Sequence, residues 1–149
     1  MVLIGHNGHL SARRAQLCEM GALLRERHGT DYFVIGTTFY AGSLLAYGMK
    51  KPGGPPGPSL IETFTLGAPP AATLENALAL AGKSPLLLDL RNSTGPVGDW
   101  LDSKLSMRWV GGIFRGEARS DYGMNPKQSY DALIYLDKIT PAHLNPGVK

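Results

Sequence analysis

The sequence of 149 residues has a single cysteine, Cys18, so no disulfide bond can form within the chain. A chain of this kind suits a reducing compartment, and we expect a cytoplasmic protein. No apolar run approaches the length of a membrane span, and the first four residues are too short for the apolar core of a signal peptide. We therefore expect no membrane partner.

Concentrated charge is also lacking. Fifteen Lys and Arg residues face twelve Asp and Glu residues, for a net charge of +3, and the basic residues are dispersed as short pairs such as Arg13-Arg14 and Lys50-Lys51. A nucleic-acid-binding surface needs clustered basic residues with interleaved aromatic residues. The sequence therefore argues against a nucleic-acid partner.

The spacing of apolar residues predicts strands that alternate with helices. We expect strands at residues 2–4, 32–40, 60–66, 86–90, 107–114 and 130–136. We expect helices at residues 12–28, 72–81 and 97–103, a Pro/Gly loop at 50–58, an irregular stretch at 115–129 and a frayed tail from Thr140. The length and the alternation predict one domain, residues 1–149, with an α/β fold whose mostly parallel sheet is flanked by helices.

Two histidines follow the first apolar run, where Gly5 ends the expected strand and His6 and His9 are separated by Asn7 and Gly8. In open α/β sheets, chemistry collects at the carboxyl ends of strands. A pair of imidazoles at such a place can transfer protons near neutral pH or hold a metal ion. We expect both rings to face a common cleft as catalytic residues; a purely structural pair is the alternative.

Three other residues are candidates for substrate binding. Arg91 ends the strand at 86–90, Tyr40 ends the strand at 32–40, and Asn7 can fix the imidazoles by hydrogen bonding. We interpret Asp89 as a structural partner of Arg91, because a carboxylate within an apolar strand needs a partner. We interpret Cys18, which lies among apolar neighbours of the expected helix, as a packing residue.

Five segments recur in order across nearly the whole chain: residues 5–9 (GHNGH), 20–25 (MGALLR), 32–43 (YFVIGTTFYAGS), 87–91 (LLDLR) and 130–135 (YDALIY). Together they resemble the C-terminal portion of the erythromycin esterase family. The resemblance implies an α/β hydrolase that acts on a small-molecule ester or lactone, such as a macrolide antibiotic. We expect no cofactor, with a divalent metal ion as the open alternative. It also places His6 and His9 in the His-Asn-x-His motif of that family, whose members are thought to activate water with histidine and glutamate.

The chain departs from this family in one respect. Family members carry another active-site histidine and a glutamate in an N-terminal portion, whereas only a short apolar run precedes His6 here. We therefore expect an incomplete part of a larger α/β hydrolytic domain, with no more than trace esterase activity alone. We also expect an exposed apolar face beside residues 2–4 and 86–90, through which the chain can self-associate.

Several mechanisms and functions stay open at this point. No Gly-x-Ser-x-Gly segment occurs, and Ser43 lacks the second glycine, so activated water is favoured over a covalent acyl-enzyme. One alternative is a catalytically inert α/β module that binds a ligand. The other is a metal-dependent hydrolase in which His6 and His9 hold a divalent metal ion, although zinc usually needs three protein ligands.

Overall fold

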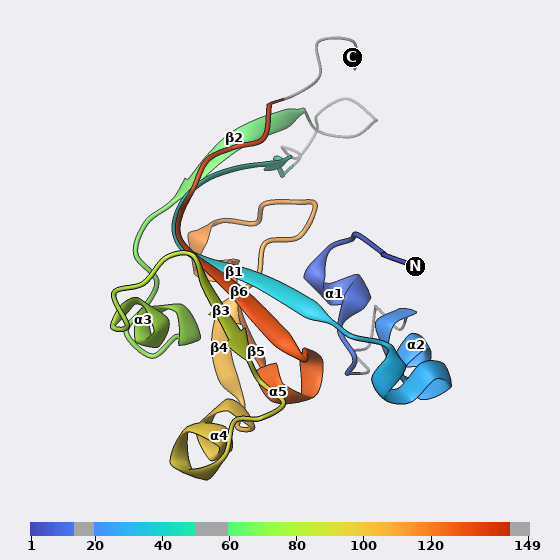
Figure 1. Cartoon of the computed structure of the whole chain (residues 1–149). Helices are drawn as coiled ribbons and strands as arrows, with labels where there is room; N and C mark the ends of the chain where they lie inside the picture. The colour runs from blue at the N-terminus through green and yellow to red at the C-terminus, as the bar shows by residue number, and fades with distance from the viewer. Residues whose placement is uncertain (14–19, 50–59, 144–149) are drawn as a thin grey trace.

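The computed structural model describes residues 1–13, 20–49 and 60–143. In these ranges, four strands form one sheet in the order β2-β1-β6-β3, and two further strands form a second sheet. The strands are β1 (Ile35–Tyr47), β2 (Ile61–Leu66), β3 (Leu86–Asp89), β4 (Leu105–Arg108), β5 (Asp121–Met124) and β6 (Ala132–Ile139). Figure 1 shows β1 and β6 side by side through the middle of the molecule.

The helices are short. They are α1 (Asn7–Leu10), α2 (Met20–His28), α3 (Leu74–Ala79), α4 (Gly95–Leu101) and α5 (Pro126–Ser129), with 3-10 turns η1 (Gly29–Asp31) and η2 (Glu117–Arg119). In Figure 1, α1 and α2 lie near the start of β1, whereas β2 lies at the opposite end of that strand. No helix within the described ranges is both long and apolar enough to cross a membrane.

The sheet is mixed, so the expectation of a mostly parallel sheet is wrong. β1 and β6 run parallel, but β1 with β2, β3 with β6, and β4 with β5 are all antiparallel pairs. The main reason is that β1 does not end near Tyr40 and continues to Tyr47. Its second half pairs with the returning strand β2, with Gly42 opposite Leu66 and Tyr47 opposite Ile61.

The expectation of a strand at residues 2–4 is also wrong. The segment pairs with no strand, and Val2 and Ile4 are almost fully exposed. Three apolar residues cannot form a strand unless a neighbour accepts their backbone hydrogen bonds. The chain turns instead into helix α1, for which His6 is the N-cap residue.

The strands near 60–66, 86–90 and 130–136 and the helices near 72–81 and 97–103 are confirmed, with their ends shifted by a few residues. The strand expected at 107–114 is shorter, because β4 ends at Arg108. Residues 115–129 are not irregular: they contain η2, β5 and α5, and the side chain of Asn125 caps α5 by accepting from the backbone of Gln128. The helix expected at 12–28 is described as helix from Met20 to His28, and residues 12 and 13 are not helical. Residues 14–19 with Cys18, the loop at 50–58 and the end of the tail lie outside the described residues.

One face of the four-stranded sheet carries the hydrophobic core. Leu133 and Tyr135 of β6 are buried there beside Gly36 and Thr38 of β1, their register partners. The core continues through α3 and the β4–β5 pair. Its fully buried apolar residues include Leu66, Leu74, Leu90, Leu101, Met107, Leu133 and Tyr135.

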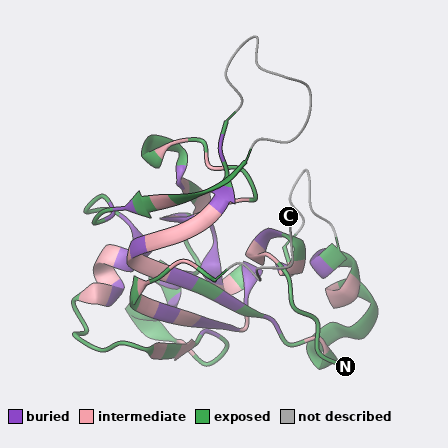
Figure 2. Cartoon of the chain, turned by 90° about the horizontal axis from the view of Figure 1, so that it is seen from above, coloured by how far each residue is buried: buried purple, intermediate pink, exposed green. Residues whose placement is uncertain are grey.

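The opposite face of the sheet is only partly covered. Side chains alternate between faces along a strand, and Ile35 and Leu87 are 44% and 66% exposed. Figure 2 shows this alternation as purple and green segments along the strands. Val2 and Ile4 before α1 and Leu87 of β3 are exposed apolar residues. That they belong to one apolar face stays a prediction. Self-association through them stays a prediction.

We expect Gly42→Ala to lower the free energy of unfolding by about 2 kcal/mol or more. Gly42 has a φ of 134° at the point where β1 contacts both β2 and β6, and an added Cβ would overlap the backbone of Ile139. Gly111→Ala is the control, because Gly111 has no positive φ and open space at its Cβ, so we expect a change within about 0.5 kcal/mol. Urea denaturation of both variants tests this, and equal effects would contradict the account.

Candidate functional site

A cavity of about 460 Å³ lies between the start of α1, strand β1 and the segment that follows β4. This volume is typical of small-molecule sites. The polar or aromatic residues that line it are His6, Asn7, Thr37, Thr38, Phe39, Arg108 and Trp109. Its aliphatic lining consists of Leu44, Leu45, Val110, Leu136 and Ile139. We refer to it as the His6 cavity.

The His6 ring is held by backbone groups on both of its nitrogens. Its Nε2 lies 2.6 Å from the carbonyl oxygen of Val110, and its Nδ1 accepts from the backbone N–H of Gly8 at 3.2 Å. A carbonyl oxygen can only accept, so Nε2 carries the hydrogen and the Nδ1 lone pair is the basic site of the ring. The edge of Trp109 packs against the ring, with centroids 5.1 Å apart.

His9 lies next to His6 but does not line the cavity. The two ring centroids are 6.3 Å apart in an edge-on arrangement, and His9 is exposed on α1. The structure therefore brings the two imidazoles together, at the start of a helix and not at the end of a strand. Only His6 is in contact with the cavity, and catalysis by either residue stays a prediction.

Asn7 connects α1 to the sheet. Its Nδ2 donates to the carbonyl of Thr37 at 2.6 Å, and its Oδ1 accepts from the Thr37 backbone N–H at 3.1 Å. On this edge of β1, pairing with β2 begins only at Gly42. The Asn7 amide thus pairs with the backbone of Thr37 as a neighbouring strand would, and so fixes the position of the adjacent His6.

Arg91 and Tyr40 lie outside the His6 cavity. Arg91 pairs with Asp89 at 2.9 Å and packs over the ring of Phe33, whereas Tyr40 packs against the hydrophobic core. Hydrogen bonds from Arg91 hold the pKa of Asp89 at about 2, below its ordinary value. The interpretation of Asp89 as a partner of Arg91 is therefore confirmed, and the structure does not bring Arg91 or Tyr40 to the histidines.

Glu75 is a buried carboxylate behind the cavity that the sequence does not single out. Its Oε1 accepts from the Thr38 hydroxyl at 2.5 Å and from the Arg108 backbone N–H at 3.0 Å, while its buried Oε2 has no partner among the described residues. Burial raises the pKa of Glu75 above its ordinary value. In the sequence, Glu75 follows the helix cap Thr73, where a glutamate is usually explained by the helix dipole.

Arg108 is the second residue that the sequence does not single out. The residue lines the cavity although it is only 4% exposed. Its Nη2 donates to the carbonyl of Gly67 at 2.5 Å, and its guanidinium lies 5.4 Å from the ring centroid of Phe39. Its Nε is buried without a hydrogen-bond partner, and no carboxylate of the described residues forms an ion pair with it.

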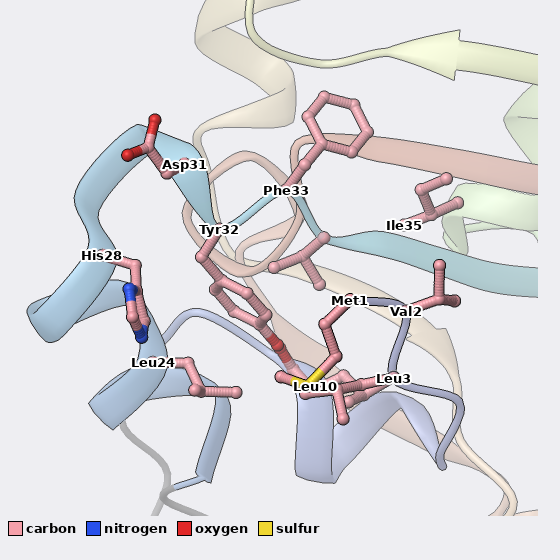
Figure 3. Close-up of a pocket in the computed structure, with 11 residues that line it drawn as sticks. Met1, Val2, Leu3, Leu10, Leu24, His28, Asp31, Tyr32, Phe33 and Ile35 are labelled. Carbon is pink, nitrogen blue, oxygen red and sulfur yellow. The ribbon is translucent and has the colours of Figure 1, made fainter.

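A second cavity of about 500 Å³ lies between the N-terminal segment, α2 and the start of β1. Figure 3 shows that its lining is mostly apolar, and that the hydroxyl of Tyr32 points toward Leu10. This hydroxyl donates to the Leu10 carbonyl at 2.7 Å. His28 and Asp31 also line this cavity, but no fixed imidazole or buried cation does. The His6 cavity is therefore the stronger candidate site.

A metal site usually needs at least three His, Cys, Asp or Glu side chains close together. The part of the chain that the structure describes contains no such group. His6 and His9 form a pair of adjacent rings, with centroids 6.3 Å apart.

Comparisons with known proteins agree with this architecture. A family model described as erythromycin esterase matches residues 1–139. A crystal structure described as a succinoglycan biosynthesis protein is similar with a TM-score of 0.77 and 21% identity, over 94% of this chain and 33% of that chain. A protein from Bacillus cereus is similar with a TM-score of 0.81 and 20% identity, over 95% of this chain and 34% of that chain. Comparison with curated proteins finds no match.

The two solved structures show a shared fold, since identity near one fifth supports nothing finer. This chain spans about a third of the length of each.

We expect Asn7→Asp to lower the free energy of unfolding by about 1–2 kcal/mol at neutral pH, because a carboxylate cannot donate to the Thr37 carbonyl. The loss relative to the unsubstituted chain should shrink below about pH 4, where a protonated carboxyl regains a donor. Denaturation of both chains across this pH range tests the expectation. A loss that does not change with pH would show that the amide bridge to Thr37 is not its cause.

Proposed function

Because the chain belongs to the erythromycin esterase family, as its sequence segments predict, we propose that it takes part in the hydrolysis of a carboxylic ester or lactone by histidine-activated water. The observation that carries the proposal is the orientation of His6 at the wall of a small-molecule-sized cavity. One ring nitrogen is anchored as a donor, so the other is the base. This is how an imidazole is usually prepared for proton transfer.

In the proposed reaction, Nδ1 of His6 takes a proton from the attacking water while the hydroxide adds to the ester carbonyl, whose π electrons move onto its oxygen. The tetrahedral intermediate then collapses, the C–O bond to the alcohol breaks, and the proton on Nδ1 passes to the leaving oxygen. The bond from Nε2–H to the Val110 carbonyl stabilises the imidazolium that forms. The backbone N–H of Gly8 has to release Nδ1 for this step, and their separation of 3.2 Å is at the long end for a hydrogen bond. His9, exposed and edge-on to the His6 ring, is placed to pass to solvent the proton that the product acid releases.

The substrate that we propose is a small-molecule ester or lactone, with macrolides as one class. The resemblance implies that longer family members add a further histidine and a glutamate to this site. This chain covers about a third of the length of each solved structure that it resembles. We therefore propose full hydrolytic activity only for a protein of that greater length. For the chain alone, we propose trace activity.

A second candidate function is an inert binding module. The observation that favours it is that both nitrogens of His6 are hydrogen bonded to the backbone, as in a histidine with a structural role. In this case the cavity binds a ligand without turning it over.

We expect His6→Gln to abolish the trace hydrolysis of an aryl ester, because it removes the general base, whose usual contribution is about 10²-fold or more. Glutamine keeps a donor for the Val110 carbonyl, so the local fold should persist. His9→Gln should have a smaller effect, because His9 does not line the cavity. His28→Gln, which changes an imidazole at the other cavity, is the matched control and should leave the rate unchanged.

These rates separate the two candidate functions. Hydrolysis above the uncatalysed rate that survives His6→Gln would exclude the proposed mechanism. A chain that shows no hydrolysis but still binds ligands in the cavity would be the binding module.

A further inference from the structure

We propose that Arg108 makes the His6 cavity a binding site for the carboxylate group of an apolar carboxylic acid. The inference deepens the proposed function, because such an acid is a product of ester hydrolysis. It does not need turnover, so binding of the acid can be tested separately from catalysis.

The first argument is the uncompensated charge of Arg108. A guanidinium is always protonated in proteins, and this one is 4% exposed. Its polar contacts are a neutral carbonyl, that of Gly67, and the face of the Phe39 ring. Neither contact carries a full negative charge. A buried cation without an anionic partner is unfavourable, so an anion that enters the cavity gains a strong, charge-assisted contact.

The second argument is that the nearby carboxylates do not pair with the Arg108 guanidinium. Glu75 accepts from the backbone N–H of Arg108, and burial favours the neutral form of its carboxyl. Asp121 faces Arg108 across the β4–β5 pair, yet its buried Oδ1 has no hydrogen-bond partner. Neither carboxylate forms an ion pair with Arg108. The Nε atom of Arg108 is buried and keeps a hydrogen that no acceptor of the described residues takes.

The third argument is the character of the remaining wall. Leu44, Leu45, Leu136 and Ile139 line the same cavity, whose volume is about 460 Å³. A small inorganic anion would leave these side chains uncovered, whereas an acid with an aliphatic chain would cover them and place its carboxylate on the guanidinium. An apolar wall with one fixed charge is the usual composition of a site that orients such a ligand.

Trp109 provides a reporter for the test. Its ring lines the cavity, and the chain has one other tryptophan, Trp100, which lies in α4. In a Trp100→Phe background, the fluorescence of Trp109 can be titrated with hexanoate and with hexanamide, its uncharged isostere. We expect hexanoate to bind at least about 10-fold more tightly than hexanamide, as a hydrogen bond between charged groups requires.

Substitutions then assign the preference to Arg108. Arg108→Met should remove the preference for hexanoate, and Arg108→Lys, which keeps the charge but loses the planar fork, should reduce it. Arg119→Met removes an exposed guanidinium from η2 and is the matched control, with unchanged binding expected. If Arg108→Met does not fold, the preference for hexanoate over hexanamide is compared between the unsubstituted protein and Arg108→Lys. This comparison still tests the role of Arg108.

Equal binding of hexanoate and hexanamide, or a preference that Arg108→Met or Arg108→Lys leaves intact, would overturn the inference. Hexanoate binding through Arg108 in a chain that does not hydrolyse esters would support the inference and contradict the proposed function. Ester hydrolysis that needs His6, in a chain that binds hexanoate no better than hexanamide, would support the proposed function and contradict the inference about Arg108.

Discussion

The candidate site depends on how the open edge of β1 is closed. A strand with one unpaired edge exposes backbone donors and acceptors, and these must find partners. At Thr37 the partner is the side-chain amide of Asn7, which both accepts and donates. This pair of hydrogen bonds fixes the start of α1 against the sheet. His6, one residue earlier, is thereby brought to the carbonyl of Val110.

Two glycines, one in α1 and one in α2, have a structural reason in this arrangement. Gly8 is buried against Trp109, and an added Cβ there would overlap the indole ring. Gly21 at the start of α2 lies so close to the backbone of Leu10 and Ser11 that it also cannot carry a side chain. The histidine segment can therefore pack between β1, β4 and α2 only with these residues, which explains why Gly8 accompanies the histidines.

Beneath the cavity, a buried polar group accompanies the histidine. The Thr38 hydroxyl and the Arg108 backbone share one oxygen of Glu75, and the other oxygen has no partner among the described residues. The Arg108 guanidinium is likewise short of partners. Unpaired polar atoms are costly in a core that only has to be stable, so such atoms are more common where a ligand binds. This is the physical basis for connecting Arg108 to a ligand.

The elements with strong local signals could be predicted from the sequence. The apolar run of β3 and the Thr73 cap and Gly82 end of α3 act within a few residues, and the structure contains both elements. Strand direction could not be predicted, because it depends on β1 continuing to Tyr47 and meeting β2. Residues 2–4 form no strand because no neighbouring strand of the described residues lies beside them, and the local sequence does not encode which segments become neighbours.

For the site too, residues with a local sequence signal could be predicted, whereas residues that depend on tertiary packing could not. His6 and Asn7 could be found from their spacing and from the family resemblance, and both line the cavity. Glu75 and Arg108 could not, because a glutamate near a helix start and an arginine at a strand end are usually solvated. Their importance comes from burial, which only the packing of α3 and β4 against β1 creates.

The central claim is that His6 is held with its hydrogen on Nε2 and its lone pair on Nδ1. Nitrogen-15 NMR of the imidazole rings measures this directly, with His6→Gln used to assign the signals. The account predicts that, at a pH above the titration of the ring, His6 is almost entirely the Nε2–H tautomer. An Nδ1–H tautomer, or the averaged signals of a freely exchanging ring such as exposed histidines give, would contradict it.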